Sequence, residues 1–433
     1  MKVLELKQSQ LQRVLAFGLL ALTVYAVFIS HTKMLVQIQS GPHLPATGLN
    51  VWPSFIEDVA RLAMAWIVLL AASALAFALV RGETKKFLGP GFFVFGISSL
   101  TVQLLTTEGR LVFSYFPAFA SIGFGAAVVV RTYQPLAILL SSLYLSAASH
   151  KLLNFSKMLE QIRESVGPEL SRELISSPAV IDFLVKSMGY VVVPLEFVMG
   201  ILVMVPRLRV AGFLLAWVFH SALVILTNDG VGLGFVGYAV LLTHVLLATH
   251  FGSIRLKLRG RDGAIGLICL LGAVALALSS GSKYAGLIWF FGLYVPLAAV
   301  YLRLMLSAQP PLELPTERWA IYVNRIWPVA LVLWFIYPIA IGYRNQQFGW
   351  AMFSGASRDK VAFCATAATH PCSDSWSLYP HIRSLRIGQE TIYVSRQYEH
   401  LERLKRELGR RCGQVSSEIS QVEKQGSSVR CPN

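Results

Sequence analysis

The stretch PLEFVMGILVMVPRLRVAGFLLAWVFHSALVIL, residues 194–226, contains two long apolar runs separated by the short basic turn PRLR. A helix needs about 20 apolar residues to cross a hydrocarbon layer of about 30 Å, and the two runs belong to apolar windows of at least that length, at 179–205 and 208–227. The whole chain has the same character, since 55% of its 433 residues are apolar, 14% are charged and its mean hydropathy is +0.58. The sequence therefore predicts an all-α, polytopic membrane protein.

Similar apolar windows recur along the chain and predict about eleven spans. They fall at residues 11–30, 59–80, 88–106, 111–130, 135–150, 179–205, 208–227, 231–250, 263–280, 284–306 and 324–343. The first window has the length of a signal peptide, but no small-residue cleavage pattern follows it, so we interpret it as a retained span. We predict a membrane domain over residues 1–343 and a tail over residues 344–433.

Basic clusters between the windows predict the orientation of the bundle. The segments MKVLELKQSQLQR, RGETKK, RTYQ, PRLR and SIRLKLRGRDG all fall on one face under this count, which the positive-inside rule makes cytoplasmic. The net charge of +15 is thereby explained by topology, and nucleic-acid binding is not expected. The segment 151–178 and the tail fall on the opposite face, which we expect to be the periplasm of a bacterial inner membrane.

Cysteine usage agrees with this orientation, because disulfides persist in oxidising compartments. Four of the five cysteines lie in the tail, namely Cys364, Cys372, Cys412 and Cys431, and Cys269 lies in a span. They predict a small disulfide-stapled cap whose pairing the sequence leaves open, with a zinc site as the alternative. Tyr398, Leu401, Leu404 and Leu408 recur at helical spacing and predict one amphipathic helix in the cap.

Ionisable residues inside the spans are costly and require a partner or a function. Asp182 and Lys186 are four residues apart on one predicted helix, which favours an internal ion pair. Glu196 and His220 lie at similar depth on two successive spans. The sequence leaves three roles open for them: a packing pair, a proton relay or a ligand site. His244 approaches the cytoplasmic end of its span, and the histidine spacing does not favour a metal.

The stretch SHKLLNFSKM, residues 149–158, places His150 and Lys151 directly after an apolar run at its outer end. One interpretation is that Lys151 anchors the helix end by extending its amine to the interface. The other is that Lys151 lies in a partly dry pocket near Lys186, where desolvation favours the neutral amine and makes it a general base. His150 would then assist it, and the following amphipathic segment would cover the pocket as a lid.

Three ordered stretches resemble the horizontally transferred transmembrane domain proteins, which include the vitamin K-dependent gamma-glutamyl carboxylases. These are YLSAASHKLLNF, the Glu helix with its basic turn and following His helix, and QQFGWAMFSG after the last span. The resemblance implies that Lys151 is the base that deprotonates a reduced quinone, and that Glu196 and His220 are the paired acidic and imidazole groups. The chain carries a His-Lys pair where the family has Lys-Lys, and its tail is shorter than the lumenal domain of the carboxylases. A smaller central block is similar to the DoxX and methylamine-utilisation membrane proteins.

Two functions follow from these patterns. The first is a quinol-dependent membrane enzyme that modifies an exported peptide or protein, with Lys151 as the base. Membrane lipid would surround this enzyme. The alternative is a non-catalytic membrane subunit or maturation partner that docks an exported protein or a larger membrane complex. The tail, with 13 basic against 8 acidic residues, would provide the docking surface in that case.

Overall fold

The helices and strands of the chain are taken from a computed structural model. It describes residues 4–6, 8–40, 54–81, 84–106, 115–130, 132–153, 155–156, 158–159, 162–163, 166, 177–228, 234–249, 256–258, 260–280, 284–306, 360–366, 376–378, 383–387, 390–394 and 416–422.

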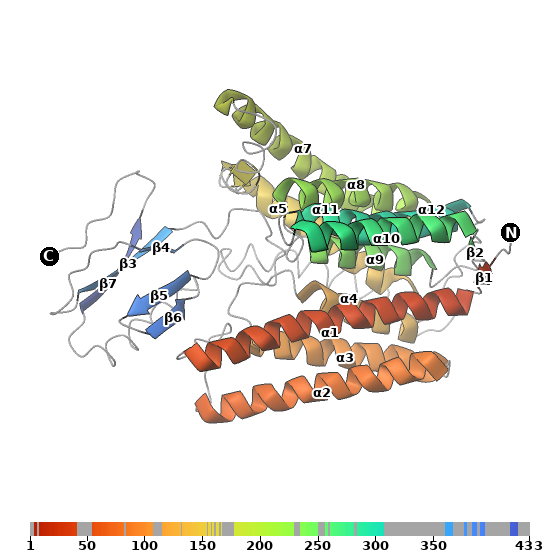
Figure 1. Cartoon of the computed structure of the whole chain (residues 1–433), viewed down its shortest axis with the longest axis horizontal. Helices are drawn as coiled ribbons and strands as arrows, with labels where there is room; N and C mark the ends of the chain where they lie inside the picture. Colours follow the sequence, from red (N-terminus) through yellow and green to blue (C-terminus); the bar gives the residue numbers. More distant parts are fainter. Residues whose placement is uncertain are drawn as a thin grey trace.

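The described chain is dominated by long helices that lie side by side in a bundle (Figure 1). They are α1 (Gln8–Ser40), α2 (Ser54–Arg81), α3 (Thr84–Thr106), α4 (Tyr115–Val130), α5 (Gln134–Leu153), α7 (Pro178–Met204), α8 (Arg209–Thr227), α9 (Phe235–Thr249), α10 (Gly260–Ser280), α11 (Ala285–Trp289) and α12 (Val295–Leu306). A 3₁₀ turn, Pro206–Leu208, joins α7 to α8, and a π-helical segment, Phe290–Tyr294, joins α11 to α12.

Five of these helical stretches are long and apolar enough to cross a membrane. They are Gln10–Phe28, Gln134–Leu153, Pro178–Met204, Pro206–Thr227 and Ala285–Leu304. Five shorter apolar helical stretches, in α2, α3, α4, α9 and α10, accompany them. The helices coincide with the first ten predicted windows, and the eleventh, at 324–343, lies outside the described residues. The prediction of a helical membrane protein is confirmed at this coarser level.

The structure also contains short strands, which the all-α prediction did not include. β1 (Leu4–Leu6) pairs antiparallel with β2 (Leu256–Leu258). In the tail, β3 (Lys360–Thr366) pairs antiparallel with β4 (Trp376–Leu378) and β7 (Ser416–Val422), and β5 (Arg383–Ile387) pairs with β6 (Glu390–Val394). The tail therefore contains sheet, which the sequence analysis did not predict, while the amphipathic helix expected around Tyr398–Leu408 lies outside the described residues.

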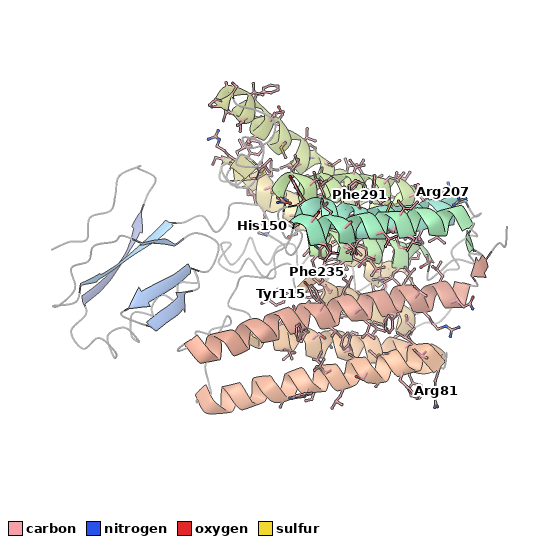
Figure 2. The ribbon with its side chains drawn as sticks, viewed as in Figure 1. Arg81, Tyr115, His150, Arg207, Phe235 and Phe291 are labelled. Atoms are coloured by element: carbon pink, nitrogen blue, oxygen red, sulfur yellow. The ribbon has the colours of Figure 1, made fainter. Side chains whose placement is uncertain are left out.

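The two ends of the bundle carry different residues. Arg81 and Arg207 lie at the end where the N-terminus lies, and His150 lies toward the other end (Figure 2). The β1–β2 pair also joins the N-terminal segment to the basic stretch that contains Lys257. Arg81, Arg207 and the β1–β2 pair thus lie toward one end of the bundle, and the cytoplasmic placement of that end stays a prediction.

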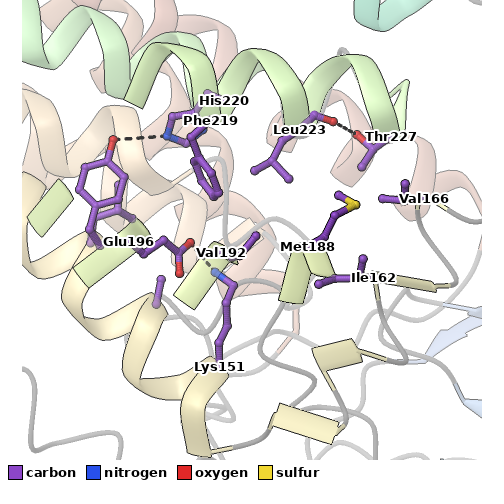
Figure 3. Close-up of a pocket in the computed structure, with 13 residues that line it drawn as sticks. Lys151, Ile162, Val166, Met188, Val192, Glu196, Phe219, His220, Leu223 and Thr227 are labelled. Carbon is purple, nitrogen blue, oxygen red and sulfur yellow. Dashed lines mark hydrogen bonds and ion pairs between the residues drawn. The ribbon is translucent and has the colours of Figure 1, made fainter. Parts of the chain in front are cut away.

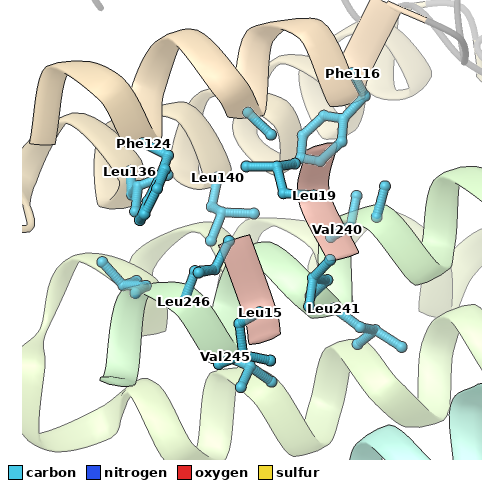
Figure 4. Packing of buried hydrophobic residues seen from close by; sticks show 14 of the residues in the cluster. Leu15, Leu19, Phe116, Phe124, Leu136, Leu140, Val240, Leu241, Val245 and Leu246 are labelled. Carbon is cyan, nitrogen blue, oxygen red and sulfur yellow. The ribbon is translucent and has the colours of Figure 1, made fainter. Parts of the chain in front are cut away.

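The core forms where α1 packs between α4 and α9. Leu15 and Leu19 of α1 lie against Phe116 and Leu140 on one side and Val245 on the other (Figure 4). Helices in lipid associate by close packing rather than by a hydrophobic drive, so small residues mark their tightest contacts. Between α3 and α4, a Cβ added at Gly96 would lie 2.7 Å from the backbone nitrogen of Ile122, so only glycine fits there.

Candidate functional site

Lys151 lies inside the bundle and not at a lipid interface. It is in the last turn of α5, and its side chain is only 3% exposed. Its Nζ donates to Oε1 of Glu196 on α7 at 2.5 Å, and the Glu196 side chain is 4% exposed. The interpretation of Lys151 as an interfacial anchor is therefore wrong, and the alternative of a dry pocket describes its position.

The reason for this burial is visible in the packing of α5 against α7. Gly200 of α7 contacts Leu145 of α5, since a Cβ there would lie 2.7 Å from Leu145 Cγ. This close approach brings the two helices together one turn from Glu196. A charge in a low-dielectric interior requires a partner, and the carboxylate on the facing helix provides it.

A cavity of about 40 Å³ opens beside this ion pair. Its polar lining includes Tyr144, Lys151, Glu196, His220 and Thr227. The rest of the lining is apolar: Leu143, Ala147, Ile162, Val166, Met188, Val192, Phe219 and Leu223. Figure 3 shows Lys151 and Glu196 joined near Val192, with Met188 and Ile162 farther along. Such a cavity, with mostly apolar walls and a few convergent polar groups, is typical of small-molecule sites.

Glu196 keeps one carboxylate oxygen for a further interaction. Its Oε2 is buried and has no hydrogen-bond partner among the described residues. An unsatisfied buried acceptor costs about 1–3 kcal/mol, or more when it is charged. A ligand hydroxyl in the cavity would satisfy this oxygen, which makes the site suited to a molecule with a hydrogen-bond donor on an apolar body.

His220 lines the same cavity but contacts a partner that the sequence analysis did not single out. Its Nε2 lies 3.4 Å from the hydroxyl of Tyr144, and Nε2 of His244 lies 3.3 Å from the same hydroxyl. Glu196 and His220, expected as a contacting pair, instead bond to Lys151 and Tyr144 respectively. Tyr144 could have been found from its position seven residues before Lys151, because two helical turns place both on one face.

The remaining predicted site residues lie away from the cavity lining. His150 is buried, at 3% exposure, but lies outside that lining. Lys186 Nζ lies 2.9 Å from Asp182 Oδ2, as their spacing predicted, and Arg163 pairs with Oδ1 of the same carboxylate. Lys186 is 57% exposed, so the expectation that it acts on Lys151 from within the pocket is not supported by its position. The acidic Glu196 is the charged neighbour instead.

The predicted disulfides fall largely outside what the structure describes. Cys372, Cys412 and Cys431 are not among the described residues, and of Cys364 only its place in β3 is described. Cys269 of α10 is a free thiol. Within the described part of the chain, no group of three or more His, Cys, Asp or Glu side chains is placed to hold a metal ion.

Comparisons of the chain with protein-family models, with curated proteins and with solved structures returned no match. The chemistry of the site is therefore argued from its own residues.

Proposed function

We propose that this protein binds a reduced quinone, or a similar lipid with an acidic hydroxyl, in the membrane cavity and removes its proton at the Lys151–Glu196 pair. The observation that carries the proposal is the buried ion pair, at 2.5 Å, on the wall of a largely apolar cavity. An ion pair that served stability alone could be replaced by apolar residues at little cost or with a gain. Its position on the wall of a cavity favours a chemical role.

The residues around the cavity fit such a ligand. Met188, Val192 and Leu223 offer an apolar surface for a ring or an isoprenoid chain. Oε2 of Glu196, which has no hydrogen-bond partner among the described residues, would accept a hydrogen bond from a ligand hydroxyl. Tyr144 and His220 add a phenol and an imidazole at the same wall. When bound, a reduced quinone would supply an acidic hydroxyl and two electrons for a later oxidation.

The ion pair itself provides the base. When the proton on Nζ of Lys151 moves along the hydrogen bond to Oε1 of Glu196, two charges become a neutral amine and a neutral acid. A low-dielectric wall favours that neutral form relative to water. The lone pair on Nζ can then accept a proton from the cavity, and Glu196 holds the first proton until it is released.

Three described residues after α5 lie beside the cavity. Met158, Ile162 and Val166 form a small apolar cluster with Val185 and Val193 of α7. Ile162 and Val166 also line the cavity. We infer that these apolar side chains help to exclude water, which strengthens the electrostatic interactions inside the site.

The substrate of the proposed enzyme follows from the family resemblance described for the sequence. By that resemblance, deprotonation of the quinol drives the modification of an exported peptide or protein on the outer face of a bacterial inner membrane. The tail, in the periplasm under the predicted orientation, would present that substrate. The bundle would retain eleven spans, with the eleventh at residues 324–343.

A chromogenic phenol tests the proton-removal step directly. The protein in lipid nanodiscs is mixed with an alkylated nitrophenol at a pH where the free probe is neutral, and phenolate absorbance is recorded. We expect the wild type to generate phenolate and the Lys151→Met/Glu196→Gln variant, which keeps the site neutral, to generate none. Lys186→Met is the matched control, because it removes an exposed lysine outside the cavity. Phenolate yields that are equal in all three proteins would refute the proposal.

The alternative function is a non-catalytic membrane subunit that docks an exported protein or a larger complex. It is favoured by the excess of basic residues in the tail, 13 against 8 acidic, and by the strands that give the tail a folded surface. An acidic partner would be attracted to such a surface. Truncation after Gly355 would then abolish co-purification of that partner while leaving phenolate formation unchanged.

A further inference from the structure

Tyr144 connects two buried imidazoles that belong to different helices. Its hydroxyl lies 3.4 Å from Nε2 of His220 on α8 and 3.3 Å from Nε2 of His244 on α9. All three side chains are buried, with exposures of 2%, 5% and 2% for Tyr144, His220 and His244. A polar group of this kind in an apolar bundle carries a cost, so its presence requires an explanation.

The hydrogen-bonding capacity of these groups defines how they can act together. A phenol has one proton to donate and lone pairs to accept, and Nε2 of a neutral imidazole is either a donor or an acceptor. Tyr144 can therefore donate to one histidine while it accepts from the other. If both protons shift together, one imidazole gains a proton, the other loses one, and the phenol is unchanged.

The series His220, Tyr144, His244 begins at the cavity wall and ends outside the cavity lining. Tyr144 and His220 line it, whereas His244 lies outside its lining. The ring of His244 instead packs edge-on against Phe213, which stacks on Tyr301. Phe213 is one turn from Arg209, at the end of α8 opposite the cavity residue Thr227. His244 thus lies on the side toward the end of the bundle that carries the basic turn.

We propose that His220, Tyr144 and His244 form a proton relay that removes from the cavity the proton collected by Lys151 and Glu196. His220 takes up the proton at the cavity wall, Tyr144 passes a proton to His244, and His244 releases it toward the Arg209 end. One N–H or O–H bond forms for each that breaks, and no electrons are transferred. This inference rests on the proposed function, since it supplies the exit for the proton removed there.

The experiment compares two signals from one reaction. The protein in nanodiscs is mixed with the alkylated nitrophenol, and phenolate absorbance is recorded together with a water-soluble pH indicator in weakly buffered solution. In the wild type we expect phenolate formation and proton release to follow the same time course. In His244→Gln, which leaves the cavity lining unchanged, phenolate should still form at the Lys151–Glu196 pair, while proton release slows by about a hundredfold or more.

Two further variants make the result specific. Thr23→Val also removes a buried hydroxyl, one on α1 that donates to the carbonyl of Leu19 at 2.9 Å, and should leave both signals unchanged. Tyr144→Phe should delay release relative to phenolate formation as His244→Gln does, and it replaces that variant if the glutamine protein does not fold. A residue with a packing role alone would lower stability or yield without separating the two signals.

The possible outcomes distinguish the relay from the proposed function. Phenolate formation with proton release that is unchanged in Tyr144→Phe and His244→Gln would overturn the relay and leave the function intact. Absence of phenolate in the wild type would overturn both. Delay in the two relay variants, with normal behaviour of Thr23→Val, would support the relay.

Discussion

At the scale of single residues, exposure separates two kinds of ion pair in this protein. Lys151 and Glu196 are 3% and 4% exposed, whereas Asp182 and Lys186 are 34% and 57% exposed. Water and salt screen the second pair, which limits its net contribution to about 0–1 kcal/mol. The first pair is almost fully buried, so loss of one partner leaves an uncompensated charge.

We therefore predict a strong coupling between Lys151 and Glu196. Lys151→Met or Glu196→Gln alone should each destabilise the protein by about 3–5 kcal/mol. The double variant should be considerably more stable than the sum of the two losses implies, because it leaves no buried charge. Unfolding of the purified protein in detergent measures this cycle. Losses that add within about 0.5 kcal/mol would show that the two groups act independently.

We expect the exposed Asp182–Lys186 pair to contribute little to the free energy of unfolding. Asp182→Asn should change the free energy of unfolding by no more than about 1 kcal/mol, although it removes the partner of both Arg163 and Lys186. The same unfolding assay applies, repeated at low and high salt. A loss as large as that of Glu196→Gln would mean that the segment over the cavity depends on Asp182.

At the scale of elements, glycines decide how closely helices approach. A Cβ added at Gly125 of α4 would lie 2.7 Å from the carbonyl oxygen of Gly89 on α3, where the contact is with rigid backbone. A Cβ added at Gly272 of α10 would meet nothing within 4 Å. Packing against α3 therefore leaves no room for a larger residue at Gly125, whereas Gly272 has space for one.

Alanine substitutions at these two glycines should therefore have opposite effects. Gly125→Ala should destabilise the protein by about 1–3 kcal/mol, because α3 and α4 must separate. Gly272→Ala should be neutral or stabilising by up to about 1 kcal/mol, because alanine is the better helix former. Denaturation with an ionic detergent titrated into a mild one compares the two. Equal midpoints for the two variants would contradict the proposed α3–α4 contact.

Helices were more predictable from the sequence than the contacts between them. An apolar window of about 20 residues identifies a span by local composition alone, so ten of the expected windows correspond to described helices. The Lys151–Glu196 contact joins residues 45 positions apart, and no local pattern encodes it. The position of Tyr144 two turns before Lys151 is a local signal, but its contacts with His220 on α8 and His244 on α9 are not encoded by any local pattern.

At the scale of the whole molecule, the two ends of the bundle differ in chemistry. The end that contains Arg81 and Arg207 also holds the β1–β2 pair with Lys257 (Figure 2). The cavity lies toward the end that contains His150, and the tail strands lie beyond that end (Figure 1). Basic residues are retained on the cytoplasmic side of membranes, so the cavity should face the opposite compartment.

Cysteine labelling in cells tests this sidedness. In a background without the five native cysteines, single cysteines are introduced at Arg81, Arg207, Leu152 and Lys186, which the structure describes as exposed or partly exposed. A membrane-impermeant maleimide should label Leu152→Cys and Lys186→Cys from the outer side, and should label Arg81→Cys and Arg207→Cys only after the membrane is opened. The two residues of each pair belong to different segments at the same end of the bundle, so both should be labelled from the same side of the membrane. Outer labelling of Arg207→Cys together with inner labelling of Lys186→Cys would reverse the orientation, and the proton relay would then lead outward rather than toward the cytoplasm.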